Sequence, residues 1–441
     1  GKVGLNGISY YAENQWQCAA LQPKHLAAIC PWEGAADYYR DMAHHGGIFC
    51  NGFTKQWSEA QVYTVQHGKG TNGFRSTMNG DWVSGPITLS EEELGANRNN
   101  FYEDCLANKL DTDEFWTSRM PDWSKVKVPM LSSANWGGQG LHPRGNFEGF
   151  VRSVSKEKWL EVHGLEHWSL YYTDYGNDLQ KRFFDCFLKD DDSGWKDQPR
   201  VSLNVRSEGE KFYLRGEEDW PIPRTEWTKF YLKSDGHLLS PQEQVGEENI
   251  SYKSTGDGVT FVSNPMEKDT EFCGPIASKI WVSSDTKDAD FFLVVRVFTP
   301  DFKEVVFHGA LDPHTPVASG WLRASHRALD KDRSTEWAPF HTHKKAEPLT
   351  PGEIYELDIE IHASGMVIPE GYRVALSIRG RDYVYPGEPD AGLSNMKNQF
   401  TGVGPFLHDD LDNRPEDVFD NQVTIHIGPD RPSYLLLPIV S

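Results

Sequence analysis

Ser9 lies where two sequence patterns meet, in the setting of a catalytic nucleophile. Residues 1–6 have a strand pattern, and a helical pattern follows over about 11–21. A serine in a tight strand-to-helix turn has its Oγ pushed out of the sheet, and the next amide, Tyr10 N–H, points at a developing oxyanion. Gly7 fits the turn because a Cβ there would clash. The predicted chemistry is nucleophilic attack on a carbonyl carbon.

The turn departs from the general nucleophile pattern in one place. A second glycine is expected two residues after the serine, and Tyr11 stands there, followed by the small Ala12. The alternative role for Ser9 is therefore the N-cap of a buried helix, with no catalytic function.

The general base is expected later in the chain, after the last strands of the sheet. Two histidines share one segment: His163 ends a strand pattern, and His167 lies in the loop beyond it. A side chain in that loop can swing over the sheet edge toward Ser9, so we assign the base to His167 and keep His163 as the alternative.

The catalytic acid has no clear candidate. It is expected just after the strand pattern of 126–133, but residues 134–145 contain no carboxylate. Glu148 and Glu166 are nearby carboxylates, and Asn135 could orient a histidine without charge. Two histidine pairs suggest metal ligands, but neither has a third ligand at a recognisable spacing, so we predict solvated loop histidines and no metal site: His44 with His45, and His341 with His343.

The elements that would position these residues alternate between strand and helix up to about residue 190. Strand patterns cover 25–30, 126–133 and 158–163, and helical patterns cover 146–154 and 175–188. Residues 37–123 lack strand patterning and contain helical stretches at 89–106 and 112–119, which is typical of a cap inserted over the sheet.

Beyond the polar segment 189–199 the apolar period changes to two. Strand patterns then recur between turn signals, without long helices, which predicts an antiparallel sandwich. They cover 201–205, 227–232, 259–262, 280–283, 291–298, 354–361, 374–378, 423–427 and 434–437.

Composition limits the classes of partner. The 441 residues carry a formal net charge of −21, which disfavours nucleic acid and anionic membrane surfaces. No apolar run approaches the roughly 20 residues of a membrane span. The six cysteines are widely spaced and are predicted to be free buried thiols, which favours a reducing, cytoplasmic compartment.

Several motifs together resemble the CocE/NonD hydrolases, a group that includes cocaine esterase, X-prolyl dipeptidyl-peptidases and α-amino acid ester hydrolases. The nucleophile region, Gly-Ile-Ser9-Tyr-Tyr-Ala-Glu-Asn-Gln-Trp-Gln, is similar to the family form Gly-x-Ser-Tyr-x-Gly followed by Gln-Trp. The resemblance continues through Gly140-Leu-His-Pro-Arg-Gly, Val162-His-Gly, Gly320-Trp-Leu-Arg-Ala-Ser-His-Arg327 and Ser433-Tyr-Leu-Leu-Leu-Pro438. It covers nearly the whole chain.

The resemblance implies a partial α/β-hydrolase core over 1–36 and 124–190, a helical cap over 37–123 and an all-β jelly-roll sandwich over 198–441. Ser9 matches the family nucleophile, His167 the base and Tyr10 N–H one oxyanion donor. The family's Asp falls on Gly138, and its second oxyanion donor, a Tyr hydroxyl, belongs to a region upstream of this chain. We therefore expect a bound N-terminal segment of the same polypeptide.

The expected function is cleavage of an ester or amide acyl bond of a small substrate through an acyl-enzyme on Ser9, without cofactor or metal. Two alternatives remain: an X-prolyl dipeptidyl aminopeptidase, and a degenerate hydrolase that binds ligands through its β-sandwich. The expected partners are a small acyl substrate, the N-terminal segment and a further copy in a homo-oligomer, with no nucleic acid and no membrane.

Overall fold

A parallel sheet forms the first half of the molecule. The computed structural model describes residues 1–63, 75–83, 89–96, 98–388 and 401–441, so parts of the predicted cap lie outside the described residues. The sheet order is β1-β2-β5-β6-β7, with every neighbouring pair parallel, and β8 adds antiparallel to β7. The strands are β1 (Val3–Ile8), β2 (Leu26–Trp32), β5 (Met130–Asn135), β6 (Lys158–His163), β7 (Val201–Ser207) and β8 (Lys211–Glu217).

Helices cover both faces of this sheet because successive side chains of a strand point to opposite faces. On one face Ala28 and Cys30 of β2 belong to a cluster with Phe183 of α8 (Asp174–Lys189). On the other face Ile29 packs with Trp16 of α1 (Tyr10–Ala20). A third helix, α7 (Pro143–Arg152), contacts β5 and β6. The predicted α/β core is confirmed.

The inserted region contains several short helices among its described residues. Its helices are η1 (Tyr39–Ala43), α2 (Asn51–Trp57), η2 (Ser58–Val62), α4 (Glu91–Ala96), α5 (Phe101–Ala107) and α6 (Glu114–Thr117), and a small hairpin joins β3 (His44–His45) to β4 (Ile48–Phe49). The single helix expected over 89–106 is two helices, with a break at 98–100, where the chain is not helical. The helix expected over 112–119 is one turn long.

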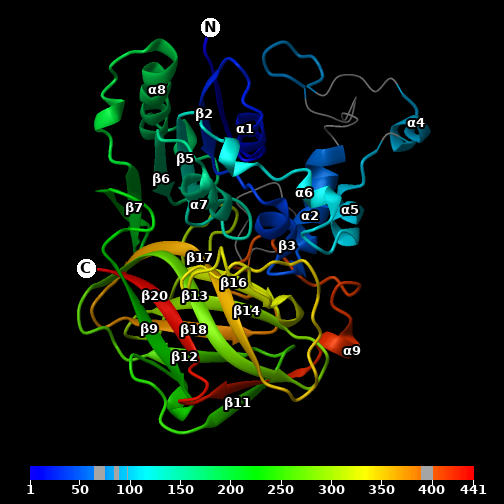
Figure 1. Ribbon diagram of the computed structural model, residues 1–441, viewed down its shortest axis with the longest axis vertical. Coiled ribbons are helices and arrows are strands. Elements are labelled where there is room, and N and C mark those ends of the chain that lie inside the picture. The colour runs from blue at the N-terminus through cyan, green and yellow to red at the C-terminus, as the bar shows by residue number, and fades with distance from the viewer. Residues whose placement is uncertain (64–74, 84–88, 97, 389–400) are drawn as a thin grey trace.

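Antiparallel strands form the second half, below the parallel sheet in Figure 1. They are β9 (Thr225–Lys233), β10 (Leu238–Ser240), β11 (Glu248–Lys253), β12 (Val259–Ser263), β13 (Thr270–Ser284), β14 (Asp290–Phe298), β15 (Glu304–Val305), β16 (Ala318–Arg323), β17 (Tyr355–Ile368), β18 (Arg373–Arg379), β19 (Gln422–Ile427) and β20 (Tyr434–Val440), with the short helix α9 (Glu416–Phe419). A large apolar core, including Phe261, Leu293 and Leu376, fills the space between them.

The paired strands of this β domain form a closed series. The series β9-β10-β12-β18-β14-β16-β17-β13-β20 closes where β20 pairs with β9. The predicted α/β core followed by a β domain is therefore confirmed at this level. A predicted strand lies elsewhere than expected: β7, expected in the sandwich, extends the parallel sheet through Leu160 and Val201. Five of the described strands beyond residue 200 were not predicted: β8, β10, β11, β15 and β16. The domain boundaries remain predictions.

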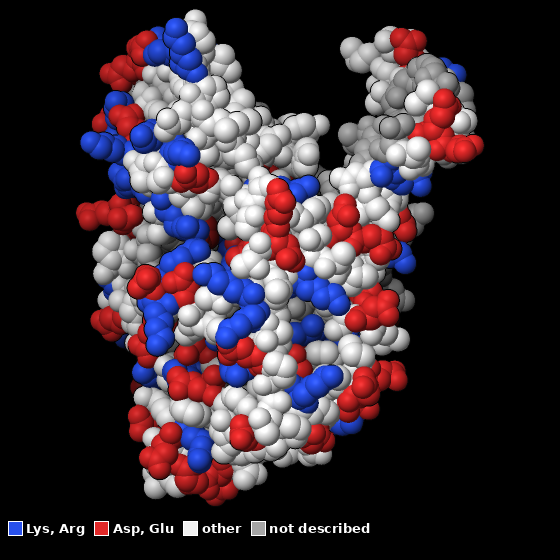
Figure 2. All heavy atoms as spheres, turned by 45° about the vertical axis from the view of Figure 1, so that its right-hand side comes forward, with Lys and Arg blue, Asp and Glu red and all other residues white. Residues whose placement is uncertain are grey.

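The structure shows how the charged residues are distributed and how far the cysteines are buried. Acidic and basic side chains are interspersed on the face shown in Figure 2. All six cysteines are free, four of them buried, whereas Cys18 and Cys186 are half-buried. Across the described ranges, no helix is both long and apolar enough to cross a membrane.

Candidate active site

Ser9 occupies a strained turn between β1 and α1. Its backbone angles are φ 61° and ψ −123°, a conformation that costs free energy in a residue with a Cβ and is often found at functional sites. The Ser9 N–H donates to the carbonyl oxygens of Trp32 (3.0 Å) and Glu33 (3.1 Å), which anchors the turn on the end of β2. A Cβ on Gly7 would lie 2.5 Å from the Cβ of Tyr11, so the expected need for glycine holds.

The side chain of Ser9 does not cap helix α1. It makes no capping hydrogen bond, and its Oγ lies 3.0 Å from Nε2 of His142 instead. The N-cap alternative is therefore wrong for the Ser9 hydroxyl. Tyr10 and Tyr11 are 57% and 69% exposed, so both rings lie at the surface beside the serine. The Tyr10 N–H is the first amide of α1 and has no intrahelical acceptor.

His142, which the sequence analysis did not select, stands at the start of α7. Its Nδ1 accepts a hydrogen bond from the Ala35 N–H at 3.2 Å, so a neutral ring carries its hydrogen on Nε2 and donates it to Ser9 Oγ. Burial, together with nearby His167, lowers the pKa of His142 well below its ordinary value. The nearest carboxylate oxygen, on Glu13, is 3.5 Å from Nδ1.

His167, unlike His142, has a carboxylate as the hydrogen-bond partner of its Nδ1. Its Nδ1 lies 2.6 Å from Oε2 of Glu33, and both side chains are buried. The rings of His142 and His167 stack with centroids 5.2 Å apart. His167 therefore lies next to the histidine that contacts the Ser9 hydroxyl. A carboxylate bound to Nδ1 fixes the tautomer in which Nε2 keeps its lone pair.

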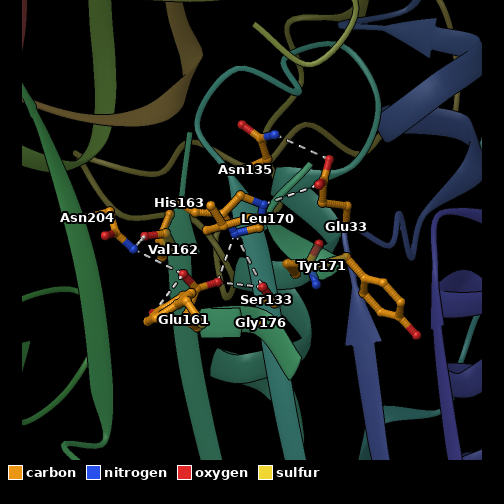
Figure 3. Close-up of polar contacts among 12 residues, drawn as sticks. Glu33, Ser133, Asn135, Glu161, Val162, His163, Leu170, Tyr171, Gly176 and Asn204 are labelled. Carbon is orange, nitrogen blue, oxygen red and sulfur yellow. Dashed lines mark hydrogen bonds and ion pairs between the residues drawn. The ribbon is translucent and has the colours of Figure 1, made fainter. Parts of the chain in front are cut away.

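Glu33 also binds His163. Its Oε1 lies 3.2 Å from Nε2 of His163, whose Nδ1 lies 2.8 Å from Oε2 of Glu161 (Figure 3). Burial opposes a charge on His163, but the two carboxylates outweigh it and raise its pKa to about 10. Burial likewise raises the pKa of Glu33, and the two histidines more than reverse this, so it is lowered. His163 is thus a buried imidazolium.

The carboxylate of this site follows β2 instead of β5. Glu33 has φ 49°, and its N–H donates to Ser133 O at 2.7 Å, so a strained turn aims its side chain over the carboxyl end of the sheet. That is the edge where parallel sheets gather functional groups. The signal in the sequence was Glu33 itself, three residues after the strand pattern of 25–30.

The other candidates for the acid lie elsewhere. Glu148 pairs with Arg152 at 3.2 Å, and Glu166 accepts from Ser169 at 3.5 Å. Asn135 donates to the Leu165 carbonyl at 2.8 Å and to Glu33 at 3.4 Å, so it supports the loop and the carboxylate (Figure 3). Gly138, at the family's Asp position, donates its N–H to the Asn135 carbonyl and brings no charge.

The predicted solvated histidines are buried, which corrects that expectation. Their exposed fractions are 5% or less because the inserted region and the β domain pack against each other around them: His44, His45, His341 and His343. Position in a loop pattern does not reveal that packing.

The fold and this site define a hydrolase with an α/β core and a C-terminal β domain. Residues 1–169 match the family model of X-Pro dipeptidyl-peptidase (S15 family), and residues 193–436 match that of the X-Pro dipeptidyl-peptidase C-terminal non-catalytic domain. The chain belongs to the CocE/NonD family of hydrolases.

Individual relatives agree with this assignment. The chain is 22% identical over 521 residues to cocaine esterase from Rhodococcus sp. (strain MB1 Bresler), covering 100% of this chain and 81% of the esterase. A crystal structure of a CocE/NonD family hydrolase from Staphylococcus aureus is 32% identical, with a TM-score of 0.85 over 100% of this chain and 72% of its own. An α-amino acid ester hydrolase, 15% identical, shares the fold with a TM-score of 0.66 over 99% of this chain and 76% of its own.

Proposed function

We propose that the protein is a serine hydrolase that cleaves an ester or amide bond of a small substrate through an acyl-enzyme on Ser9. The observation that carries this proposal is the strained Ser9 turn facing two stacked histidines, of which His167 is held by Glu33. The nucleophile, a base and an orienting carboxylate thus converge from three different strand ends.

His167 acts as the general base. Its Nδ1–H is bound to Glu33, so Nε2 is free to take the hydroxyl proton. His142 is poorly suited to that step, because its Nε2 carries hydrogen while the Ala35 N–H occupies Nδ1. The Ser9 hydroxyl turns about its Cα–Cβ bond from His142 to His167 when substrate enters, since hydrogen bonds between catalytic groups often form fully only in the complex.

His163 is the weaker candidate for the base because both of its ring nitrogens are paired with carboxylates. With a pKa raised to about 10 it has no lone pair to offer near neutral pH. Its positive charge instead holds Glu33 ionised, and that carboxylate in turn stabilises the imidazolium that forms on His167. The Tyr10 N–H, at the start of α1, donates to the oxyanion of the tetrahedral intermediate.

The degenerate-hydrolase alternative loses its two supports. It rested on a missing acid and an incomplete nucleophile turn, and Glu33 fills the first gap while the φ of 61° at Ser9 answers the second. The dipeptidyl-peptidase alternative needs a carboxylate that binds the substrate's free amine, and the sequence does not single out a carboxylate for that role. We therefore propose esterase activity first.

Labelling with a fluorophosphonate tests the nucleophile. The wild-type protein and Ser169→Ala, a serine in the His167 loop, should react, whereas Ser9→Ala should not and should lose turnover of aryl esters by about 10³-fold or more. Labelling that survives in Ser9→Ala would rule out this nucleophile.

The base is tested by burst kinetics on an aryl ester. His167→Ala should abolish the acylation burst, and His142→Ala should slow it less. The reverse order would transfer the base to His142. Turnover of an X-Pro p-nitroanilide at a higher kcat/KM than of aryl esters would instead favour the peptidase.

A further inference from the structure

Two neighbouring parts of the inserted region and a distant segment bring three buried side chains together next to Gly140. His45 ends β3, Cys50 precedes α2, and His408 lies in the segment before α9. Their exposed fractions are 1%, 0% and 0%, and one potential ligand atom from each lies within 4.8 Å of the other two. The mechanism proposed above uses none of them.

The outer nitrogen of each ring is already bound. His45 Nε2 lies 2.8 Å from the Gly140 carbonyl oxygen, and His408 Nδ1 lies 2.8 Å from Oδ1 of Asp382. Oδ2 of Asp382 accepts the backbone N–H of His408 at 2.7 Å, which fixes the carboxylate. A carbonyl or carboxylate on the outer nitrogen is the arrangement that orients metal-ligating histidines.

The two inner nitrogens face each other. Nδ1 of His45 and Nε2 of His408 are 2.9 Å apart. Since each outer nitrogen donates its hydrogen outward, a contact between the inner lone pairs requires one extra hydrogen, and with it a buried positive charge. A metal ion can replace that hydrogen while both outer hydrogen bonds remain.

Cys50 supplies a third ligand of a different kind. Its sulfur receives the Phe53 N–H and is fully buried. A metal ion that binds this sulfur displaces the thiol proton. Aromatic packing holds the histidine rings in place: Trp321 against His45 at 4.7 Å between centroids, and Phe292 against His408 at 5.4 Å.

We propose that His45 Nδ1, His408 Nε2 and Cys50 Sγ bind a transition metal ion of the Zn²⁺ type. Two imidazoles and a thiolate are ligands that suit zinc and cobalt(II) and disfavour Mg²⁺ or Ca²⁺. Binding forms two N–metal bonds and one S–metal bond, and it releases two protons to solvent, the thiol proton and the hydrogen shared by the rings. Because His45 also binds the Gly140 carbonyl, the ion ties the cap to the loop that carries His142.

Cobalt(II) as a probe tests the site. Protein produced in a defined medium with Co²⁺ as the added transition metal should retain one ion per chain by elemental analysis and show the near-ultraviolet thiolate-to-Co²⁺ absorption band. Cys50→Ser should lose the band. Cys105→Ser, which changes another fully buried thiol of the inserted region, should keep it.

A second pair of measurements covers the case in which Cys50→Ser folds poorly. Asp382→Asn keeps all three ligands and should weaken Co²⁺ binding by about 10–100-fold. Co²⁺ or Zn²⁺ should raise the thermal midpoint of the wild type and of Cys105→Ser. A folded wild type that retains no metal, or a thiolate band that survives Cys50→Ser, would overturn the proposal and leave a proton-linked histidine pair.

Discussion

Glu33 is shared by two buried imidazoles. Its Oε2 binds Nδ1 of His167 at 2.6 Å, while its Oε1 binds His163 at 3.2 Å. A carboxylate in such a position stays ionised, because protonation would break two charge-assisted hydrogen bonds in a buried site. Glu33 therefore has the properties required of the residue that orients a catalytic base, although it follows a different strand from the family's Asp.

The exchange Glu33→Gln removes the charge and nearly preserves the shape. We expect kcat for an aryl ester to fall by about 10³–10⁴-fold, because the neutral amide no longer stabilises a charged His167. Glu161→Gln is the matched control: it removes the other carboxylate that binds His163 but does not touch His167. Equal losses in the two variants would argue that Glu33 acts only through His163.

At the scale of elements, the carboxyl ends of β2, β5 and β6 form one buried polar layer. Glu33 directly follows β2, β5 contributes Ser133, and β6 contributes Glu161 and His163, with Ser133 Oγ bridging to Glu161 at 2.5 Å (Figure 3). Parallel pairing brings these residues together, since Ser133 is in register with Glu161. The layer holds an imidazolium between two carboxylates, so its stability depends on pH.

We expect the free energy of unfolding to fall at alkaline pH through His163. Its folded pKa of about 10 lies above the ordinary 6.5, so its contribution is fully present below pH 6.5 and is lost as the pH rises through about 10. Denaturant unfolding at pH 6 and pH 10.5 measures this loss. Glu13, whose pKa burial raises to about 8, adds a loss of the same sign.

His163→Gln separates the two effects. The variant keeps the Glu13 contribution and lacks that of His163, so its stability should change less between the two pH values than that of the wild type. Parallel pH profiles for the two proteins would show that the His163 ion pairs do not survive in solution.

At the scale of the whole molecule, the β domain helps to position two loops of the site, 136–142 after β5 and 164–169 after β6. The loop before β16 contacts both: the Ala310 N–H donates to Gly137 O at 2.9 Å, and the His167 N–H donates to Ala310 O at 3.0 Å. Ion pairs of the buried Arg144 of α7 lie nearby, one with the half-buried Glu360 of β17 at 3.1 Å and one with the buried Asp41 at 3.0 Å. The alignment of His167 thus depends on residues more than a hundred positions later in the chain.

Ala310→Pro tests that dependence. Proline removes the N–H that binds Gly137 and restricts the preceding residue, so we expect kcat to fall by about 100-fold through misplacement of the His167 loop. Ala310→Ser retains the N–H and should keep most of the activity. Circular dichroism verifies that the β domain is folded, and wild-type kcat in Ala310→Pro would contradict the role of this contact.

The sequence by itself determined the local pieces. Ser9, the strand ranges of β1, β2 and β6, and helices α1 and α8 could be predicted because a turn, an apolar period or a helical face is written within a few neighbouring residues. The antiparallel pattern after residue 200 was equally local. These features also sufficed for the resemblance to the CocE/NonD hydrolases.

Only the tertiary structure decided which polar groups meet. Glu33 and His142 join Ser9 and His167 through parallel strand pairing, and His45 and Cys50 meet His408 across more than three hundred residues. No local pattern encodes such encounters, because they depend on register, on strained turns and on the closure of one domain over another. This closure is also why the histidines expected in solvent are buried within the protein. Burial then determines the charge of each group.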